Sequence, residues 1–266
     1  MLESFLIFAF TGAAAGVLAG LFGVGGGLIM VPALVFVLPR QGVAPEIIMQ
    51  VAIGTSLAVI GVTSLSSTRA HHTRGGVRWD VLKAFAPGLA LGALAGAFVA
   101  HALKGRTLEI IVGTGALLIA LQMLRGNPPG GSDASLPAPP ALELLGVGGL
   151  IGVLSALVGI GGGSLSVPYL AMRRLPMVQA VGSAAAGGIP IAWGGTLGFV
   201  MSGAGLVGLP GPHLGYVSLG GFVGLAVFSV MTAPLGARLA HRLPAVRLKQ
   251  GFAALLAVVG TLMLLR

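Results

Sequence analysis

The sequence AGLFGVGGGLIMVPAL at residues 19–34 and the related sequence SALVGIGGGSLSVPYL at residues 155–170 decide the fold of this chain. Each contains three consecutive glycines inside a long apolar stretch and continues to a Val-Pro pair. Glycine in a helix interior costs about 1 kcal/mol relative to alanine, so three in succession disfavour a continuous helix. Both sequences therefore predict a broken helix.

The composition places these breaks in a lipid bilayer. Of the 266 residues, 56% are hydrophobic and 46 are glycine, whereas only 8% are charged. A soluble domain carries about 25% charged residues, so the composition excludes a soluble enzyme, a disordered segment and a nucleic-acid-binding module. The abundant glycine indicates helices that approach one another closely through small residues. The absence of cysteine excludes disulfides and thiolate metal sites.

The apolar residues fall into eight blocks, at residues 4–39, 47–68, 81–103, 107–124, 144–172, 177–212, 214–237 and 250–265. Because one span needs about 20 apolar residues, six blocks predict single helices, whereas 4–39 and 144–172 are too long and contain the glycine runs. Irregular backbone at membrane depth is tolerated only where protein or a water-filled cavity covers it. We therefore expect an all-α, polytopic integral membrane protein with two glycine-broken, re-entrant helices. No basic residue precedes the first apolar run, so a cleaved signal peptide is not expected.

The two halves of the chain are related. Residues 16–34 match residues 152–170 at 11 of 19 positions, which indicates an internal duplication. Residues 125–140 are rich in proline and glycine and are typical of a linker. The sequence thus predicts a first transmembrane repeat at residues 1–124, a linker at 125–140 and a second transmembrane repeat at 141–266.

The distribution of positive charge favours inverted repeats. If each broken helix enters and leaves on one side of the membrane, 11 of the 15 Lys and Arg residues gather on one face and 4 on the other. If both are single crossings, the split is 9 to 6. Because positive residues concentrate on the cytoplasmic side, the first arrangement is favoured, with both termini facing away from the cytoplasm.

The helix restarts near Leu28 and Ser164 predict an anion site. Free N–H groups and the positive end of the helix dipole would point back at each break, although glycines that only permit close helix packing remain the alternative. Serine, threonine and glutamine in neighbouring helices could donate to the same anion, or instead bond their own and adjacent helices. The candidate substrate-binding residues are Gly25, Gly26, Gly27, Gln50, Thr55, Ser56, Gly161, Gly162, Gly163, Ser164, Ser166, Gln179 and Ser183.

No charged residue or histidine lies near the centre of an apolar block. A carboxylate or histidine proton relay is therefore disfavoured, and no metal or other cofactor is expected. An anion would have to be held by N–H groups, hydroxyls and helix dipoles. The basic loop at residues 69–79 predicts topological anchoring on the cytoplasmic side, with an antechamber for anions as the alternative.

The paired G-[VI]-GGG…VP segments, Gly54-Thr55-Ser56, the HHTRGGVRW loop, and the APGLALGALAG and APLGARLAHRL segments resemble the sulfite exporter TauE/SafE family over essentially the whole chain. The resemblance implies a bacterial inner-membrane permease, not an enzyme, that carries sulfite, sulfoacetate or related sulfonates by alternating access. Its expected partners are a small anionic substrate and the lipid bilayer, without nucleic acid. The alternatives are a permease for another small organic anion, an anion channel, and a membrane-embedded assembly subunit. Ala184 stands where the first repeat has Ser56, so the repeats are unequal as ligand sources.

The inverted topology can be tested with single cysteines in this cysteine-free chain. Arg74→Cys and Lys104→Cys should react with a membrane-impermeant maleimide from opposite sides of the membrane, because an apolar block at residues 81–103 separates the two positions. Labelling of both positions from the same side would contradict the topology.

Overall fold

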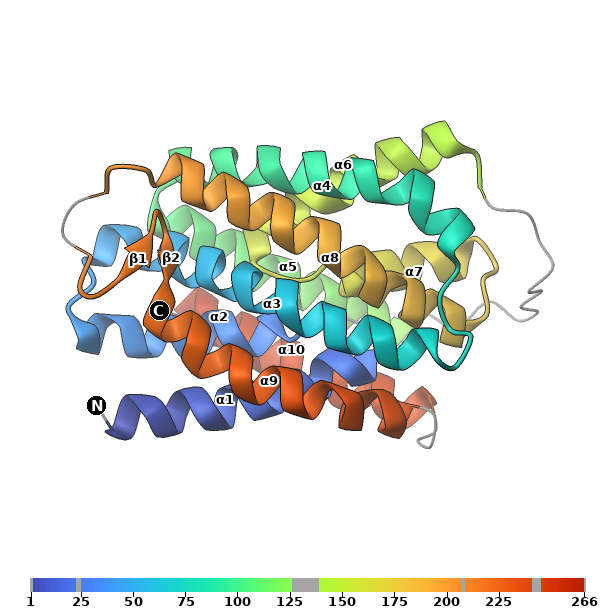
Figure 1. Ribbon diagram of the computed structural model, residues 1–266, viewed down its shortest axis with the longest axis horizontal. Helices are drawn as coiled ribbons and strands as arrows, with labels where there is room; N and C mark the ends of the chain where they lie inside the picture. Colours follow the sequence, from blue (N-terminus) through green and yellow to red (C-terminus); the bar gives the residue numbers. More distant parts are fainter. Residues whose placement is uncertain (1, 23–24, 126–138, 207–208, 241–244, 266) are drawn as a thin grey trace.

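The computed structural model describes residues 2–22, 25–125, 139–206, 209–240 and 245–265, and nearly all of them are helical (Figure 1). The described elements are α1 (Leu2–Phe22), α2 (Gly27–Val37), η1 (Leu38–Gln41), η2 (Pro45–Ile47), α3 (Ile48–His72), α4 (Trp79–Ala102), α5 (Gly105–Arg125), α6 (Ala141–Val158), α7 (Gly163–Met172), α8 (Met177–Ser202), β1 (His213–Leu214), β2 (Val217–Ser218), α9 (Leu219–Ala240) and α10 (Ala245–Leu265). The two short strands form one antiparallel hairpin.

Six stretches of the described chain are long and apolar enough to cross a membrane. They are Pro45–His72, Trp79–Ala102, Gly105–Gln122, Ala141–Val158, Met177–Ser202 and Leu219–Leu239. Shorter apolar stretches lie in α1, α2 and α10, at Leu6–Leu21, Gly27–Gln41 and Leu256–Leu265. The prediction of an all-α, polytopic membrane protein is confirmed.

The helices follow the apolar blocks with one informative difference. Blocks 4–39 and 144–172 each contain two helices, α1 with α2 and α6 with α7, separated at the glycine runs. Block 177–212 is longer than its helix, because α8 ends at Ser202 and the Gly- and Pro-rich residues that follow lead into the β1–β2 hairpin. Residues 126–138 of the expected linker lie outside the described residues.

Helices of one half pack mainly against helices of the other. The most extensive contacts join α1 to α9 and α4 to α6, followed by α4 with α8, α3 with α8 and α5 with α10. In the sequence repeat α1 corresponds to α6. A second, weaker similarity, between GAFVAHAL at residues 96–103 and GARLAHRL at residues 236–243, relates α4 to α9. The α1–α9 and α6–α4 contacts are therefore equivalent. Figure 1 shows the start of α1 and the end of α2 at one end of the long axis, and the start of α6 and the end of α7 at the opposite end.

Glycines spaced four residues apart permit the two largest helix contacts. In α1, the spaced glycines are Gly12, Gly16 and Gly20, and an added Cβ at each would meet backbone of α9. In α4, Gly88, Gly92 and Gly96 lie in the same way against backbone of α6. In a bilayer no hydrophobic force drives helices together, so they associate through van der Waals packing, which is favoured where small residues let their backbones approach closely. The high glycine content thus has a definite structural use.

A side chain at one of these crossings should destabilise the protein. Gly16→Leu would drive its Cβ into the backbone oxygen of Ser229 and the hydroxyl of Thr232, and overpacking of this kind costs about 1–3 kcal/mol. Gly146→Leu is the matched control, because Gly146 lies in α6 with open space around its added Cβ. We expect a lower thermal midpoint in detergent for Gly16→Leu only. Equal midpoints would show that the α1–α9 contact has little energetic weight.

Candidate functional site

The two glycine breaks adopt left-handed backbone at the start of the second helix of each pair. Gly26 precedes α2 with a φ of 78°, and Gly162 precedes α7 with a φ of 71°. Gly25 and Gly159 are also left-handed, with φ of 78° and 74°. Only glycine adopts this conformation without strain, which explains why each break requires several glycines.

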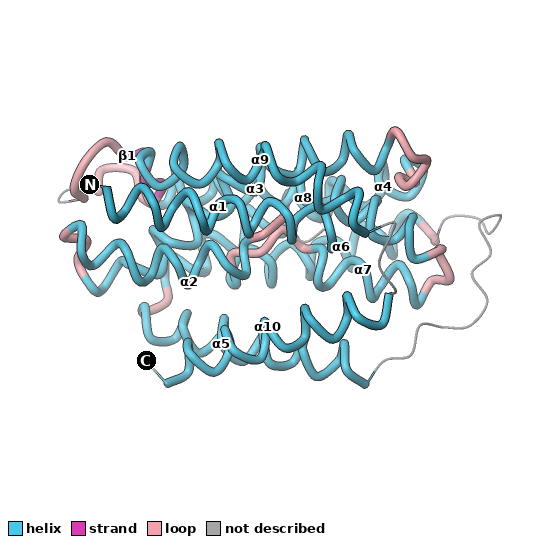
Figure 2. Tube along the Cα trace, turned by 90° about the horizontal axis from the view of Figure 1, so that it is seen from below, coloured by secondary structure: helices cyan, strands magenta, loops and turns pink. Residues whose placement is uncertain are grey.

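The breaks lie against each other near the middle of the bundle (Figure 2). A Cβ added to Gly25 would stand 3.3 Å from Cα of Gly161, and one added to Gly27 would meet the carbonyl oxygen of Gly159. The Ser56 hydroxyl of α3 donates to that same Gly159 oxygen at 3.1 Å. The structure therefore brings together both predicted glycine runs and one of the predicted hydroxyls.

Each restarted helix presents free backbone donors at its break. The N–H groups of Leu165 and Ser166 bond to the Gly162 oxygen at 3.0 and 2.7 Å, and those of Ile29 and Met30 bond to the Gly26 oxygen at 3.2 and 3.3 Å. No side chain caps either helix. The earlier N–H groups of α2 and α7 have no partner within the helix, so they can donate to a ligand that enters the break.

The second break also gathers serine hydroxyls. Ser155, Ser164 and Ser166 are 0%, 4% and 0% exposed. Their hydroxyls have no hydrogen-bond partner within the described part of the chain. Ser155 lies one helical turn before the break, and its Oγ would stand 3.3 Å from a Cβ added to Gly162.

The first break lacks these hydroxyls. At the sequence offset of 136, the positions equivalent to the three serines are Ala19, Leu28 and Met30. The polar side chains are therefore concentrated at one break, although each break ends in a left-handed glycine, Gly26 or Gly162, directly before the next helix.

Two other predicted hydroxyls have structural partners away from the breaks. Thr55 Oγ1 accepts the N–H of Ser218, the residue before α9, at 2.9 Å. Ser183 Oγ accepts the N–H of Arg78, the residue before α4, at 2.9 Å. These are equivalent contacts in the two halves, and each fastens the start of a helix that belongs to the other half.

The predicted glutamines lie at the starts of their helices. Gln50, in the first turn of α3, donates through Nε2 to the carbonyl oxygen of Leu103 at 2.9 Å, just after α4. Gln179 lies in the first turn of α8 and is half-buried. The structure thus separates both glutamines from the glycine breaks along their helices.

Ser155 lies at the second break but is not among the residues predicted from the sequence. A usable signal was present, because Ser155 stands four residues before Gly159 and so one helical turn from the break. Its equivalent in the first half is Ala19, so the repeat itself draws no attention to this position.

Charged side chains lie at the ends of the helices. Glu143 accepts a hydrogen bond from the Tyr169 hydroxyl at 2.6 Å and pairs with Arg173, which ties the start of α6 to the end of α7. Hydrogen bonding to Glu143 raises the pKa of Arg173. Within the described residues no cluster of His, Asp or Glu is suited to hold a metal ion. The breaks themselves offer only neutral donors.

A bundle of apolar helices that encloses two facing helix breaks defines a polytopic membrane protein of the transporter class. Sequence comparison gives the particular family: residues 8–263 match the sulfite exporter TauE/SafE family, and the chain belongs to it.

Among its relatives, a probable membrane transporter protein of Haemophilus influenzae is 36% identical over the full length of both chains. A probable membrane transporter protein of Methanocaldococcus jannaschii is 28% identical over 94% of this chain and 91% of its own. One of Bacillus subtilis is 31% identical over 65% of this chain and 69% of its own. No solved structure matches the chain.

The fastening contacts predict a stability effect. Thr55→Val removes the acceptor of the part-buried Ser218 N–H, and loss of such a hydrogen bond costs about 0.5–1.5 kcal/mol. Ser183→Ala should act in the same way at Arg78. Thr261→Val is the control, because Thr261 is exposed and its hydroxyl donates to the Ala257 oxygen of its own helix. We expect lower thermal midpoints for the first two variants and unchanged ligand affinity. A loss of affinity without a loss of stability would place these hydroxyls in the substrate site.

Proposed function

We propose that this protein carries small sulfur oxyanions or sulfonates, such as sulfite or sulfoacetate, across the bacterial inner membrane by alternating access, and that the second break is the main contact with the anion. The observation that carries the proposal is a group of three buried serine hydroxyls at that break, Ser155, Ser164 and Ser166, which have no hydrogen-bond partner among the described residues. Carriage of this kind needs no covalent chemistry, so the protein would not act as an enzyme.

The free energy of unsatisfied hydroxyls favours a ligand at this place. A buried polar group without a partner costs about 1–3 kcal/mol, and native structures contain few such groups. Here three such hydroxyls lie within one helical turn of the same break, beside the free N–H groups of α7. A ligand with several acceptor oxygens would satisfy all of them together. Sulfite and sulfonates carry three such oxygens on one sulfur atom.

The sign of the ligand charge follows from the donors. Backbone N–H groups only donate, and the start of α7 carries the positive end of the helix dipole. Residues 155–170 contain no Asp or Glu that would repel an anion, and no Lys or Arg that would hold it permanently. A site of neutral donors binds an oxyanion and also releases it, which a carrier requires.

The arrangement of the halves supports alternating access. We propose that the chain consists of two inverted repeats whose broken helices are re-entrant. This agrees with the 11 to 4 division of Lys and Arg and with the packing of α1 on α9 and of α6 on α4. In the present arrangement, Gly25 and Gly161 lie so close that a Cβ added to Gly25 would stand 3.3 Å from Cα of Gly161. An anion would enter when one repeat rocks against the other and separates the breaks.

Substitution of the serines should test the site. Ser164→Ala combined with Ser166→Ala removes two donors to a charged ligand, each worth about 1.5–3 kcal/mol, so affinity should fall at least about tenfold. Ser202→Ala is a matched control, because Ser202 is another hydroxyl without a described partner but lies at the far end of α8. The measurement is thermal stabilisation of the purified protein by sulfite, thiosulfate, sulfoacetate and simple carboxylates.

The outcomes separate the alternatives. Stabilisation by sulfur oxyanions that is lost only in the double variant supports the proposal, whereas equal stabilisation of both variants contradicts the serine site. Stabilisation by carboxylates alone would assign the protein to another class of organic anion. Saturable counter-transport in liposomes distinguishes a carrier from an anion channel.

A further inference from the structure

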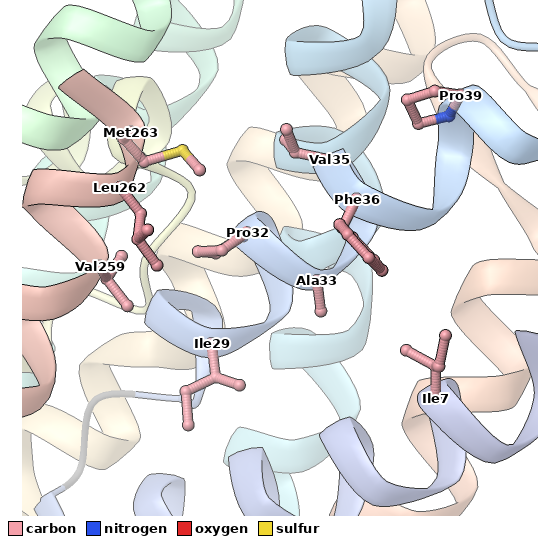
Figure 3. Close-up of a pocket in the computed structure, with 10 residues that line it drawn as sticks. All are labelled: Ile7, Ile29, Pro32, Ala33, Val35, Phe36, Pro39, Val259, Leu262 and Met263. Carbon is pink, nitrogen blue, oxygen red and sulfur yellow. The ribbon is translucent and has the colours of Figure 1, made fainter. Parts of the chain in front are cut away.

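An apolar groove runs along the first broken helix. It has a volume of about 550 Å³ and lies between α1, α2 and α10 (Figure 3). Its lining is entirely apolar and consists of Ile7, Ile29, Pro32, Ala33, Val35, Phe36, Pro39, Val259, Leu262 and Met263. Phe36 and Leu262 are 55% and 57% exposed, so the groove opens towards the surroundings of the helices.

The second half of the chain closes the equivalent position. At the sequence offset of 136, Ile7 corresponds to Glu143, and Ala33 to Tyr169. In the second half these residues bond to each other and to Arg173 across the gap between α6 and α7. In the first half both positions line the groove. An open apolar groove therefore replaces a polar bridge.

The length of the groove matches one leaflet of a bilayer. Its lining along the chain runs from Ile29, next to the break, to Pro39 in η1. Ten residues of helix extend about 15 Å, which is half of the hydrocarbon thickness of about 30 Å. A groove that begins near the middle of the bundle and ends at its surface has the depth of a single acyl chain.

A cation stands at the outer end of the groove. Arg40 directly follows Pro39, its Cζ lies 3.8 Å above the Phe36 ring, and its Nη1 donates to the Phe36 carbonyl oxygen at 2.8 Å. Within the described chain, Arg40 makes no ion pair with a carboxylate. A guanidinium has five N–H donors, so the remaining donors are available to a phosphate, which Arg binds through paired hydrogen bonds.

We propose that this groove binds one phospholipid, with an acyl chain between α2 and α10 and the phosphate on Arg40. The apolar lining suits an acyl chain, the groove is about as long as such a chain in one leaflet, and Arg40 complements the negative charge of the phosphate. The lipid would join the α5–α10 pair to the broken helix, at a place where α10 makes few other contacts with α2 (Figure 2).

A photoreactive lipid tests the proposal directly. The protein is reconstituted into vesicles of phosphatidylethanolamine and phosphatidylglycerol that contain phosphatidylglycerol with a diazirine in its acyl chain, and the cross-linked peptides are mapped. We expect the label to concentrate at residues 29–39 and 259–263. An even distribution over the other exposed apolar faces of the helices would overturn the proposal without any variant.

Two variants distinguish the contact with the acyl chain from the contact with the headgroup. Ala33→Trp should fill the groove and reduce labelling there to background, whereas Ala95→Trp, at an exposed alanine of α4 outside the groove, should leave it unchanged. Arg40→Gln should weaken retention of the lipid about tenfold, because a charged hydrogen bond is lost.

Native mass spectrometry in mild detergent provides the second readout. One retained phospholipid, lost in Ala33→Trp, supports the proposal. Undiminished labelling in Ala33→Trp, retention that is insensitive to Arg40→Gln, or cross-links between two copies of the chain through α2 would each overturn it.

Discussion

The two helix breaks impose the constraint on which the rest of the structure depends. Their backbone cannot be satisfied by lipid, so other parts of the protein must cover it. The breaks cover each other at Gly25 and Gly161, and α3 seals them from the side through Ser56 and Ile60. The surrounding helices therefore have to bring two segments 136 residues apart in the sequence into direct contact.

Close glycine crossings make that arrangement possible. Because α1 packs on α9 and α6 on α4, the first helix of each broken pair lies against a helix of the other half. The Thr55 and Ser183 hydroxyls add equivalent fastenings between the halves, at the starts of α9 and α4. Contacts of this kind couple the two halves, which the proposed rocking of one repeat against the other requires.

The duplicated framework carries unequal chemistry. The second break holds three serine hydroxyls, and a Glu143–Tyr169–Arg173 bridge ties its two helices together. The first break is apolar, and an open groove with Arg40 at its end takes the place of the bridge. The related halves thus differ in their side chains, and our proposals place the substrate contact in the second half and the lipid contact in the first.

The sequence by itself determined the all-α membrane class, the position of both breaks and the family, because three successive glycines and long apolar blocks act locally. It did not determine which hydroxyls lie at a break: Ser155 lies there without having been among the predicted residues, and Thr55 and Ser183 accept hydrogen bonds at the starts of α9 and α4. The physical reason is that these helices are apolar on nearly all sides, so the pattern that orients a helix in a soluble protein is absent. Only the tertiary structure, through glycine crossings that fix the rotation of each helix, decided which side chains meet at the centre.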